Sequence, residues 1–128
     1  MLVGCSLVLA SLPLSSPASA GTELIGRAAW VSYAGLATLR VYPTAAGREI
    51  AGDFGKTAAH GDEAWGEVLA LAPDADTPGM RAQFLCHWNF AEFAQPGKNS
   101  WDLEPWRPPV SQAAMLGTGC NPGGAERG

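Results

Sequence analysis

The apolar and polar residues of the N-terminal half alternate with the period of a β-strand. Between residues 24 and 44 β-forming residues predominate, and Leu39 and Val41 stand on either side of the polar Arg40. Successive side chains of a strand point to opposite faces, so this two-residue period is typical of a half-buried strand. Gly35, which suits a turn, divides the segment in two. The pattern therefore predicts an N-terminal β-hairpin.

The middle of the chain changes to helical spacing. Between Asp62 and Ala72 apolar residues recur every three or four positions, and Pro73 ends the segment. Asp62 and Glu63 suit the first turn of this helix, where negative charge is favoured by the helix dipole. The glycine-rich stretch 47–61 before it predicts a loop or an irregular β segment.

A second helix is predicted over residues 78–94, with Thr77 or Asp76 as its cap and Pro78 in its first turn. It carries two apolar stripes, one made of Met80, Phe84, Trp88 and Ala91 and the other of Cys86, Phe90 and Phe93. A helix that is apolar on nearly all sides is expected at the centre of a domain. A strand remains the alternative, because the residues from 84 to 90 also alternate; the length of the segment and Pro78 favour the helix.

The C-terminal third is rich in proline and glycine. Residues 100–109 contain three prolines and predict an extended segment or an edge strand, and residues 110–116 predict a short helix that ends at Gly117. Residues 120–124 predict a turn, and disorder is expected at 125–128. Together these elements predict one small α+β domain, in which the hairpin packs on two or three helices.

The first twenty residues have the pattern of an export signal. Residues 2–14 are almost entirely apolar, Pro17 interrupts the run, and the small residues Ala18 and Ala20 predict a cut before Gly21. We therefore expect a signal peptide at 1–20 and a single secreted domain at 21–124.

Three alternatives to a cleaved signal stay open. Leu2-Val3-Gly4-Cys5 resembles a bacterial lipobox, which would make Cys5 a lipid-anchored terminus. The apolar run could also remain as an uncleaved membrane anchor. No basic residue precedes the run, so the true start could lie upstream.

Charge and cysteine content restrict the partners and the compartment. The chain has 8 basic and 12 acidic residues, a net charge of −4, and no cluster of Lys or Arg. This composition argues against nucleic acid and anionic lipid as main partners, and after cleavage no stable membrane span is expected. In an oxidising compartment the two remaining thiols, Cys86 and Cys120, predict a disulfide. Metal-binding or reactive thiols fit less well, because there is no Cys-x-x-Cys.

Several motifs together resemble the DUF2599 family, a group of small secreted, mostly actinobacterial proteins of unknown function. They are Pro-Asp-Ala-Asp-Thr-Pro-Gly-Met (73–80), Gln-Phe-Leu-Cys-His-Trp (83–88), Trp-Asp-Leu-Glu-Pro-Trp-Arg-Pro (101–108) and Cys-Asn-Pro-Gly (120–123). The resemblance covers about residues 25–124. It implies a secreted protein and implies no activity.

His87 is the strongest candidate for catalysis, because imidazole is the side chain best suited to act as a base near neutral pH. Asp102 or Glu104 could orient it, which would make the protein a small secreted hydrolase. The competing interpretation is that His87 is a buried structural residue, satisfied by Gln83, a carboxylate or the backbone.

The segment around Trp101 and Trp106 suggests binding, because tryptophan rings stack on sugars and Arg107 offers a bidentate fork. With Gln83 these residues form the candidate ligand site for an extracellular glycan, peptide or protein. Alternatively, both tryptophans are core and Arg107 pairs with Glu104. Only His60 and His87 could be histidine ligands and their spacing matches no metal motif, so neither a metal nor another cofactor is expected. A non-catalytic extracellular or cell-envelope binding module is the favoured prediction.

Overall fold

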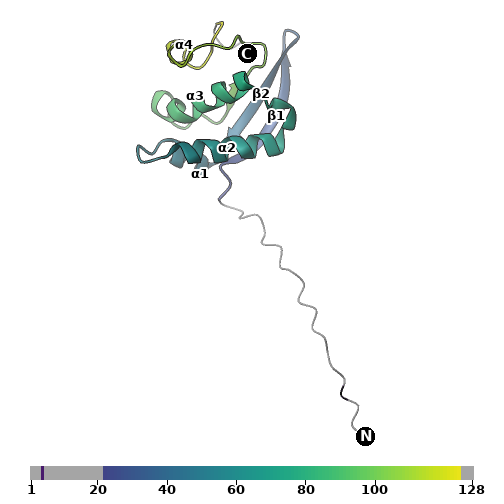
Figure 1. Cartoon of the computed structure of the whole chain (residues 1–128), viewed down its shortest axis with the longest axis vertical. Coiled ribbons are helices and arrows are strands. Elements are labelled where there is room, and N and C mark those ends of the chain that lie inside the picture. Colours follow the sequence, from purple (N-terminus) through teal and green to yellow (C-terminus); the bar gives the residue numbers. More distant parts are fainter. Residues whose placement is uncertain (1–3, 5–21, 125–128) are drawn as a thin grey trace.

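The computed structural model describes Gly4 and residues 22–124 (Figure 1). The predicted signal peptide apart from Gly4, its cleavage position after Ala20, Cys5 and the predicted tail at 125–128 lie outside the described residues. The elements in chain order are β1 (Ile25–Tyr33), β2 (Leu36–Pro43), α1 (Ala45–Ala51), α2 (Ala58–Leu71), the 3₁₀-helix η1 (Pro73–Ala75), α3 (Pro78–Ala94), β3 (Trp101–Leu103) and α4 (Gln112–Gly117). This composition confirms the predicted α+β class.

The predicted hairpin is present as β1 and β2, which pair antiparallel with Trp30 opposite Leu39. Ala34 and Gly35 form the turn with φ angles of 50° and 78°. Two-residue hairpin loops need such positive φ angles to match the twist of their strands, and glycine adopts them at no steric cost. The short strand β3 pairs antiparallel with β2, so β2 is the middle strand in the order β1-β2-β3. The extended segment predicted at 100–109 thus begins as an edge strand.

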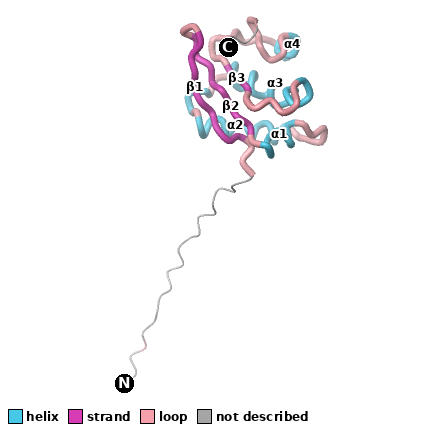
Figure 2. The backbone as a smooth tube through the Cα atoms, turned by 180° about the vertical axis from the view of Figure 1, so that it is seen from behind, coloured by secondary structure: helices cyan, strands magenta, loops and turns pink. Residues whose placement is uncertain are grey.

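The helices lie on one face of this sheet (Figures 1 and 2). Leu39 and Val41 point to that face and are completely buried, whereas Arg40 between them is partly exposed. Phe84 of α3 lies at the centre of the core, with its ring centroid 5.5 Å from that of Trp65 and 5.9 Å from that of Trp101. The core is therefore an aromatic cluster between the sheet and the two long helices.

Helix α3 has the predicted bounds, Pro78–Ala94, and the alternative of a strand is wrong. The Thr77 hydroxyl accepts a 3.1 Å hydrogen bond from the Met80 amide, which satisfies one of the free N–H groups of the first turn. Pro78 occupies a first-turn position, where its missing N–H costs nothing.

The loop predicted at 47–61 is wrong at both ends. Helix α1 occupies residues 45–51 and is capped by Thr44, whose hydroxyl accepts from the Gly47 amide at 2.9 Å. Helix α2 begins at Ala58 with Thr57 as its cap, and the Thr57 amide donates to His60 Nδ1 at 3.0 Å. Asp62 and Glu63 are therefore inside α2 and do not cap it. Only residues 52–57 connect the helices.

The expectation that α3 is buried on nearly all sides is also wrong. The stripe of Met80, Phe84 and Trp88 is in the core, but Phe90 and Phe93 of the second stripe are exposed. Among the described residues, only α4 and its flanking segments lie over that side of the helix (Figure 1), where Met115 and Cys120 pack against Cys86. Part of an apolar helix face is therefore open to solvent.

Candidate functional site

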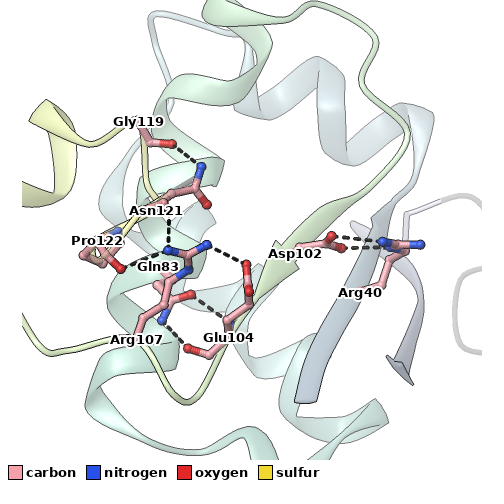
Figure 3. Close-up of polar contacts among 9 residues, drawn as sticks. Arg40, Gln83, Asp102, Glu104, Arg107, Gly119, Asn121 and Pro122 are labelled. Atoms are coloured by element: carbon pink, nitrogen blue, oxygen red, sulfur yellow. Dashed lines mark hydrogen bonds and ion pairs between the residues drawn. The ribbon is translucent and has the colours of Figure 1, made fainter. Parts of the chain in front are cut away.

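A buried polar cluster joins α3, the residues after β3 and the C-terminal turn (Figure 3). The Gln83 amide donates to the Glu104 carbonyl at 2.9 Å and accepts from the Glu104 amide at 2.8 Å, so the side chain pairs with the backbone as a strand would. Arg107 donates to the Glu104 carboxylate at 2.9 Å and to the carbonyls of Pro122 and Gly124 at 2.9 Å and 2.6 Å. Gln83, Glu104 and Arg107 are all buried. The polar groups of each residue hold one segment of the polypeptide against another.

The other predicted carboxylate, Asp102, is bound to the open face of the sheet. Its two oxygens accept from Arg40 at 2.8 Å and 3.0 Å (Figure 3). The same guanidinium donates to the Tyr33 hydroxyl at 2.7 Å. The hydrogen bond to Asp102 raises the pKa of Arg40 above its ordinary value. Asp102 and Glu104 are thus both held by arginines, and neither makes a hydrogen bond to His87 with its carboxylate in the described part of the chain.

His87 is only 5% exposed and its ring stacks on Trp101, with centroids 6.3 Å apart and planes 7° from parallel. Its Nε2 is buried and has no hydrogen-bond partner among the described residues. Burial lowers the pKa of His87 to about 4, helped by the nearby charges of Lys98 and Arg107 and opposed by the backbone and charge of Asp102. The imidazole is therefore neutral at physiological pH.

The predicted binding residues have different surroundings. Trp101 is completely buried in the aromatic core, and Gln83 and Arg107 are engaged inside the protein. Trp106 is half-buried, and the Arg107 guanidinium carbon lies 4.6 Å from its ring centroid. Only Trp106 has appreciable surface to offer a ligand.

The predicted disulfide between Cys86 and Cys120 is present, with Cα atoms 5.6 Å apart. It ties α3 to the turn after α4, beside the hydrogen bonds of Arg107 to Pro122 and Gly124. Two attachments therefore hold the C-terminal segment, the disulfide to α3 and the hydrogen bonds to Arg107 after β3.

Two hollows are lined by α3 and by residues of this attached segment, and sequence reasoning identified neither. The first, which we call the α3–α4 groove, has a volume of about 490 Å³. Its apolar lining includes Ala82, Leu85, Phe90, Val110, Met115 and Leu116. Three of these, Phe90, Val110 and Leu116, are between 37% and 46% exposed, which is unusual for large apolar side chains that converge on one place. The second apolar stripe of α3, which includes Phe90, is the feature of the sequence that points to this groove.

The second hollow, which we call the Lys98 cavity, is an open depression of about 970 Å³ that Leu116 also lines. Its polar lining residues are His87, Gln95, Lys98, Thr118 and Asn121. Phe90 and Leu116 line both hollows, so the two are neighbours that share a wall.

The described residues offer neither a metal site nor a membrane-spanning helix. Among them, no group of three His, Cys, Asp or Glu side chains is placed to hold a metal ion. No helix formed by these residues is long and apolar enough to cross a membrane.

The fold and its attachments define a small α+β domain whose C-terminal segment is tied to its longest helix by a disulfide. The chain belongs to the DUF2599 family, described as proteins of unknown function, whose family model matches residues 25–123. The family motifs at 83–88, 101–108 and 120–123 are the segments that meet in the buried polar cluster and the disulfide.

Relatives occur in mycobacteria and are uncharacterised proteins. One from Mycobacterium tuberculosis and one from Mycobacterium bovis are each 54% identical over 114 residues, which cover 89% of this chain and 72% of the relative. One from Mycobacterium leprae is 48% identical over 97 residues, covering 76% of this chain and 77% of the relative. No solved structure matches the chain.

Proposed function

We propose that the protein is an exported, non-catalytic binding module of the cell exterior or envelope, and that its ligand lies in the α3–α4 groove. The observation that carries this proposal is the convergence of Phe90, Val110 and Leu116 on one groove of about 490 Å³. Ligand sites are typically apolar hollows of this size with a few polar groups at their rim. Here Asn89 and Gln112 provide such polar groups.

The surroundings of His87 favour binding over the alternative of a hydrolase. A general base needs a polar orienting group and access to substrate. His87 is almost completely buried, and the carboxylates of Asp102 and Glu104 are bound by arginines. No observation favours the hydrolase, and we assign these residues to holding the fold.

Export is supported by the sequence of residues 1–20 and by the disulfide, which is typical of oxidising compartments. In the proposed mature protein the domain begins at Gly21. N-terminal sequencing of the protein released from an expressing bacterium should give Gly21 first, and Ala20→Leu should block the cut because signal peptidases need a small residue there. A lipid-modified Cys5, or an uncleaved chain in the membrane fraction, would contradict a secreted module.

Groove binding is tested with a fluorescent apolar probe such as anilinonaphthalene sulfonate and a variant that fills the groove. Ala82 is exposed on α3 and lines the groove, so Ala82→Trp should weaken probe binding by about tenfold or more, which is the loss expected when a pocket is blocked. Ala70→Trp on α2 is the matched control, since Ala70 is exposed and lines neither hollow. Circular dichroism of both variants establishes that they fold. Equal binding by the two variants would refute the assignment of the groove.

A further inference from the structure

We propose that the α3–α4 groove binds Phe54 of a second copy of this chain, so that two copies form a symmetric dimer and each fills the groove of the other. The inference rests on the proposed function, because it takes the groove as the binding site and names the partner. It is carried by three observations: an exposed aromatic side chain, its position on the same side of α3 as the groove, and complementary charges beside the two.

Phe54 is the most exposed large apolar side chain of the described residues, at 92%. It belongs to the loop between α1 and α2, and its ring centroid lies 5.0 Å from that of Phe93 near the end of α3. Of the seven exposed large apolar side chains in the described residues, three line the groove and two are this pair. Phe90 and Phe93, three residues apart on α3, connect the two sets. A continuous exposed apolar surface of this kind marks an interaction site.

Phe54 does not fill the groove of its own chain. Phe93, which it contacts, is not a lining residue of the groove. The loop that carries Phe54 and helix α4, which forms one wall of the groove, lie on opposite flanks of α3 (Figures 1 and 2). The aromatic side chain and the hollow are therefore both open to a second molecule.

The groove and Phe54 nevertheless lie along one side of α3. Ala82, Cys86 and Asn89 line the groove, and Phe93 continues this series four residues after Asn89. Residues at spacings of three and four lie on one side of an α-helix. Ala82 and Phe93 are roughly 16 Å apart along the helix, at about 1.5 Å per residue. Packing α3 antiparallel against α3 of a second copy therefore brings the Phe93 end of each helix over the Ala82 end of the other.

This antiparallel arrangement has a two-fold axis across the middle of α3. A protruding group that enters a hollow elsewhere on an identical molecule produces open chains unless the arrangement closes. Here it closes, because Phe54 and the groove lie at opposite ends of one helix side and a single two-fold rotation places both Phe54 side chains. The dimer buries the exposed aromatic pair and the apolar lining of both grooves.

The charges beside Phe54 and the groove are complementary. Lys56 follows Phe54 by two residues, and its ammonium lies 5.0 Å from the Phe93 ring centroid. Asp76 is an exposed lining residue of the groove just before α3 begins. Within the described part of the chain neither Lys56 nor Asp76 belongs to an ion pair. In the antiparallel dimer Lys56 of each copy meets Asp76 of the other, whereas a parallel dimer would bring like charges together.

The experiment is sedimentation equilibrium of the oxidised exported protein over a range of concentrations, which should show monomer and dimer in equilibrium. Phe54→Ser removes a side chain that the fold leaves exposed, and it should weaken dimerisation by about thirtyfold or more, the loss typical of an interface anchor. Leu71→Ser is the matched control. Leu71 is 48% exposed on α2 and lines neither hollow, so its replacement should leave the dissociation constant unchanged.

Two combinations of variants test how the copies meet. Ala82→Trp blocks the groove and keeps Phe54, so its mixture with Phe54→Ser should associate more tightly than either variant alone, because one intact contact forms. Lys56→Glu and Asp76→Lys should each weaken dimerisation by about fivefold or more, as expected when an exposed charge contact becomes repulsive. The double variant should recover the affinity of the wild type.

Several results would overturn the inference, and they are distinct from failure of the proposed function. A monomer at all concentrations, with probe binding that Ala82→Trp still weakens, would refute the second copy and leave the groove to a foreign apolar ligand. A dimer that persists in Phe54→Ser would place the interface elsewhere, for example along the edge of β1. Assemblies that keep growing with concentration would contradict the closed two-fold arrangement. Absence of both the dimer and probe binding would refute the proposed groove site itself.

Discussion

Arg107 donates a 2.9 Å hydrogen bond to the Glu104 carboxylate, and the two side chains are 0% and 4% exposed. The same guanidinium also donates hydrogen bonds to the carbonyls of Pro122 and Gly124. A charge is costly to bury unless it is paired and hydrogen-bonded. The pair therefore holds the C-terminal turn in place because each partner needs the other.

Removing one member of this pair should be strongly destabilising. Arg107→Leu leaves the Glu104 carboxylate buried without its cation, and the free energy of unfolding should fall by about 3 to 5 kcal/mol. The double variant with Glu104→Leu should lose less than the sum of the two single losses, which urea denaturation of all four proteins measures. Arg81→Ala is the control, because its ion pair with Asp62 is exposed and should be worth about 1 kcal/mol or less. Additive losses would contradict the coupling of Arg107 and Glu104.

The disulfide should contribute a similar amount to the free energy of unfolding. Cys86 and Cys120 are 34 residues apart, and closing such a loop restricts the unfolded chain by about 3 to 4 kcal/mol in the chain-entropy account. Reduced protein and the double Cys86→Ser and Cys120→Ser variant should lose this amount in denaturant titrations, with helix α3 still present by circular dichroism. An unchanged unfolding midpoint after complete reduction would show that Arg107 and Glu104 suffice to hold the segment.

Gly47 should not tolerate alanine. An added Cβ would overlap the Leu24 carbonyl oxygen, which belongs to the backbone and cannot turn away as a side chain would. Gly47→Ala should therefore cost about 2 kcal/mol or more through displacement of α1 from the sheet. Gly66→Ala is the matched control within helix α2, since nothing lies within 4 Å of its Cβ, and it should stabilise the fold by about 0.5 to 1 kcal/mol. Thermal unfolding of the two variants should shift in opposite directions.

The free energy of unfolding should decrease at acid pH because His87 becomes protonated. Its pKa in the folded protein is about 4, below its ordinary value of 6.5, so between these values the unfolded chain binds a proton that the folded protein does not. The stabilisation is complete above pH 6.5 and is lost progressively as the pH falls towards 4, on the order of 3 kcal/mol in all. His87→Gln should make the unfolding free energy nearly independent of pH in this range. His60→Gln is the control and should keep the pH dependence, since His87 is intact. The same slope in His87→Gln would assign the acid sensitivity to other groups.

The parts of the fold that local chemistry decides were predictable from the sequence. The bounds of α3 follow from Thr77 and Pro78, and the hairpin turn follows from Gly35. Helix α1 was missed because it has only seven residues and contains Gly47, whose presence suggests a loop. The glycine is there for the close approach to Leu24, a contact between residues distant in sequence that no local pattern reports.

The site was less predictable than the fold. The residue types at Gln83 and Glu104 do not reveal that a side chain of α3 pairs with a backbone 21 positions away. The apolar pattern of α3 included Phe90 and predicted its burial, but Phe90 is exposed. An apolar pattern alone does not distinguish a residue packed in its own domain from one open to a ligand. The candidate groove became apparent only once the domain was seen to leave that side of the helix open.

The position of the disulfide has a consequence for when the protein becomes able to bind. Cys86 is a lining residue of the α3–α4 groove and Cys120 is a lining residue of the Lys98 cavity. Formation of the one bond therefore completes a wall of each hollow at the same moment. Under the proposed export, the chain would lack that bond in a reducing cytosol and would acquire the proposed ligand only after crossing into an oxidising compartment.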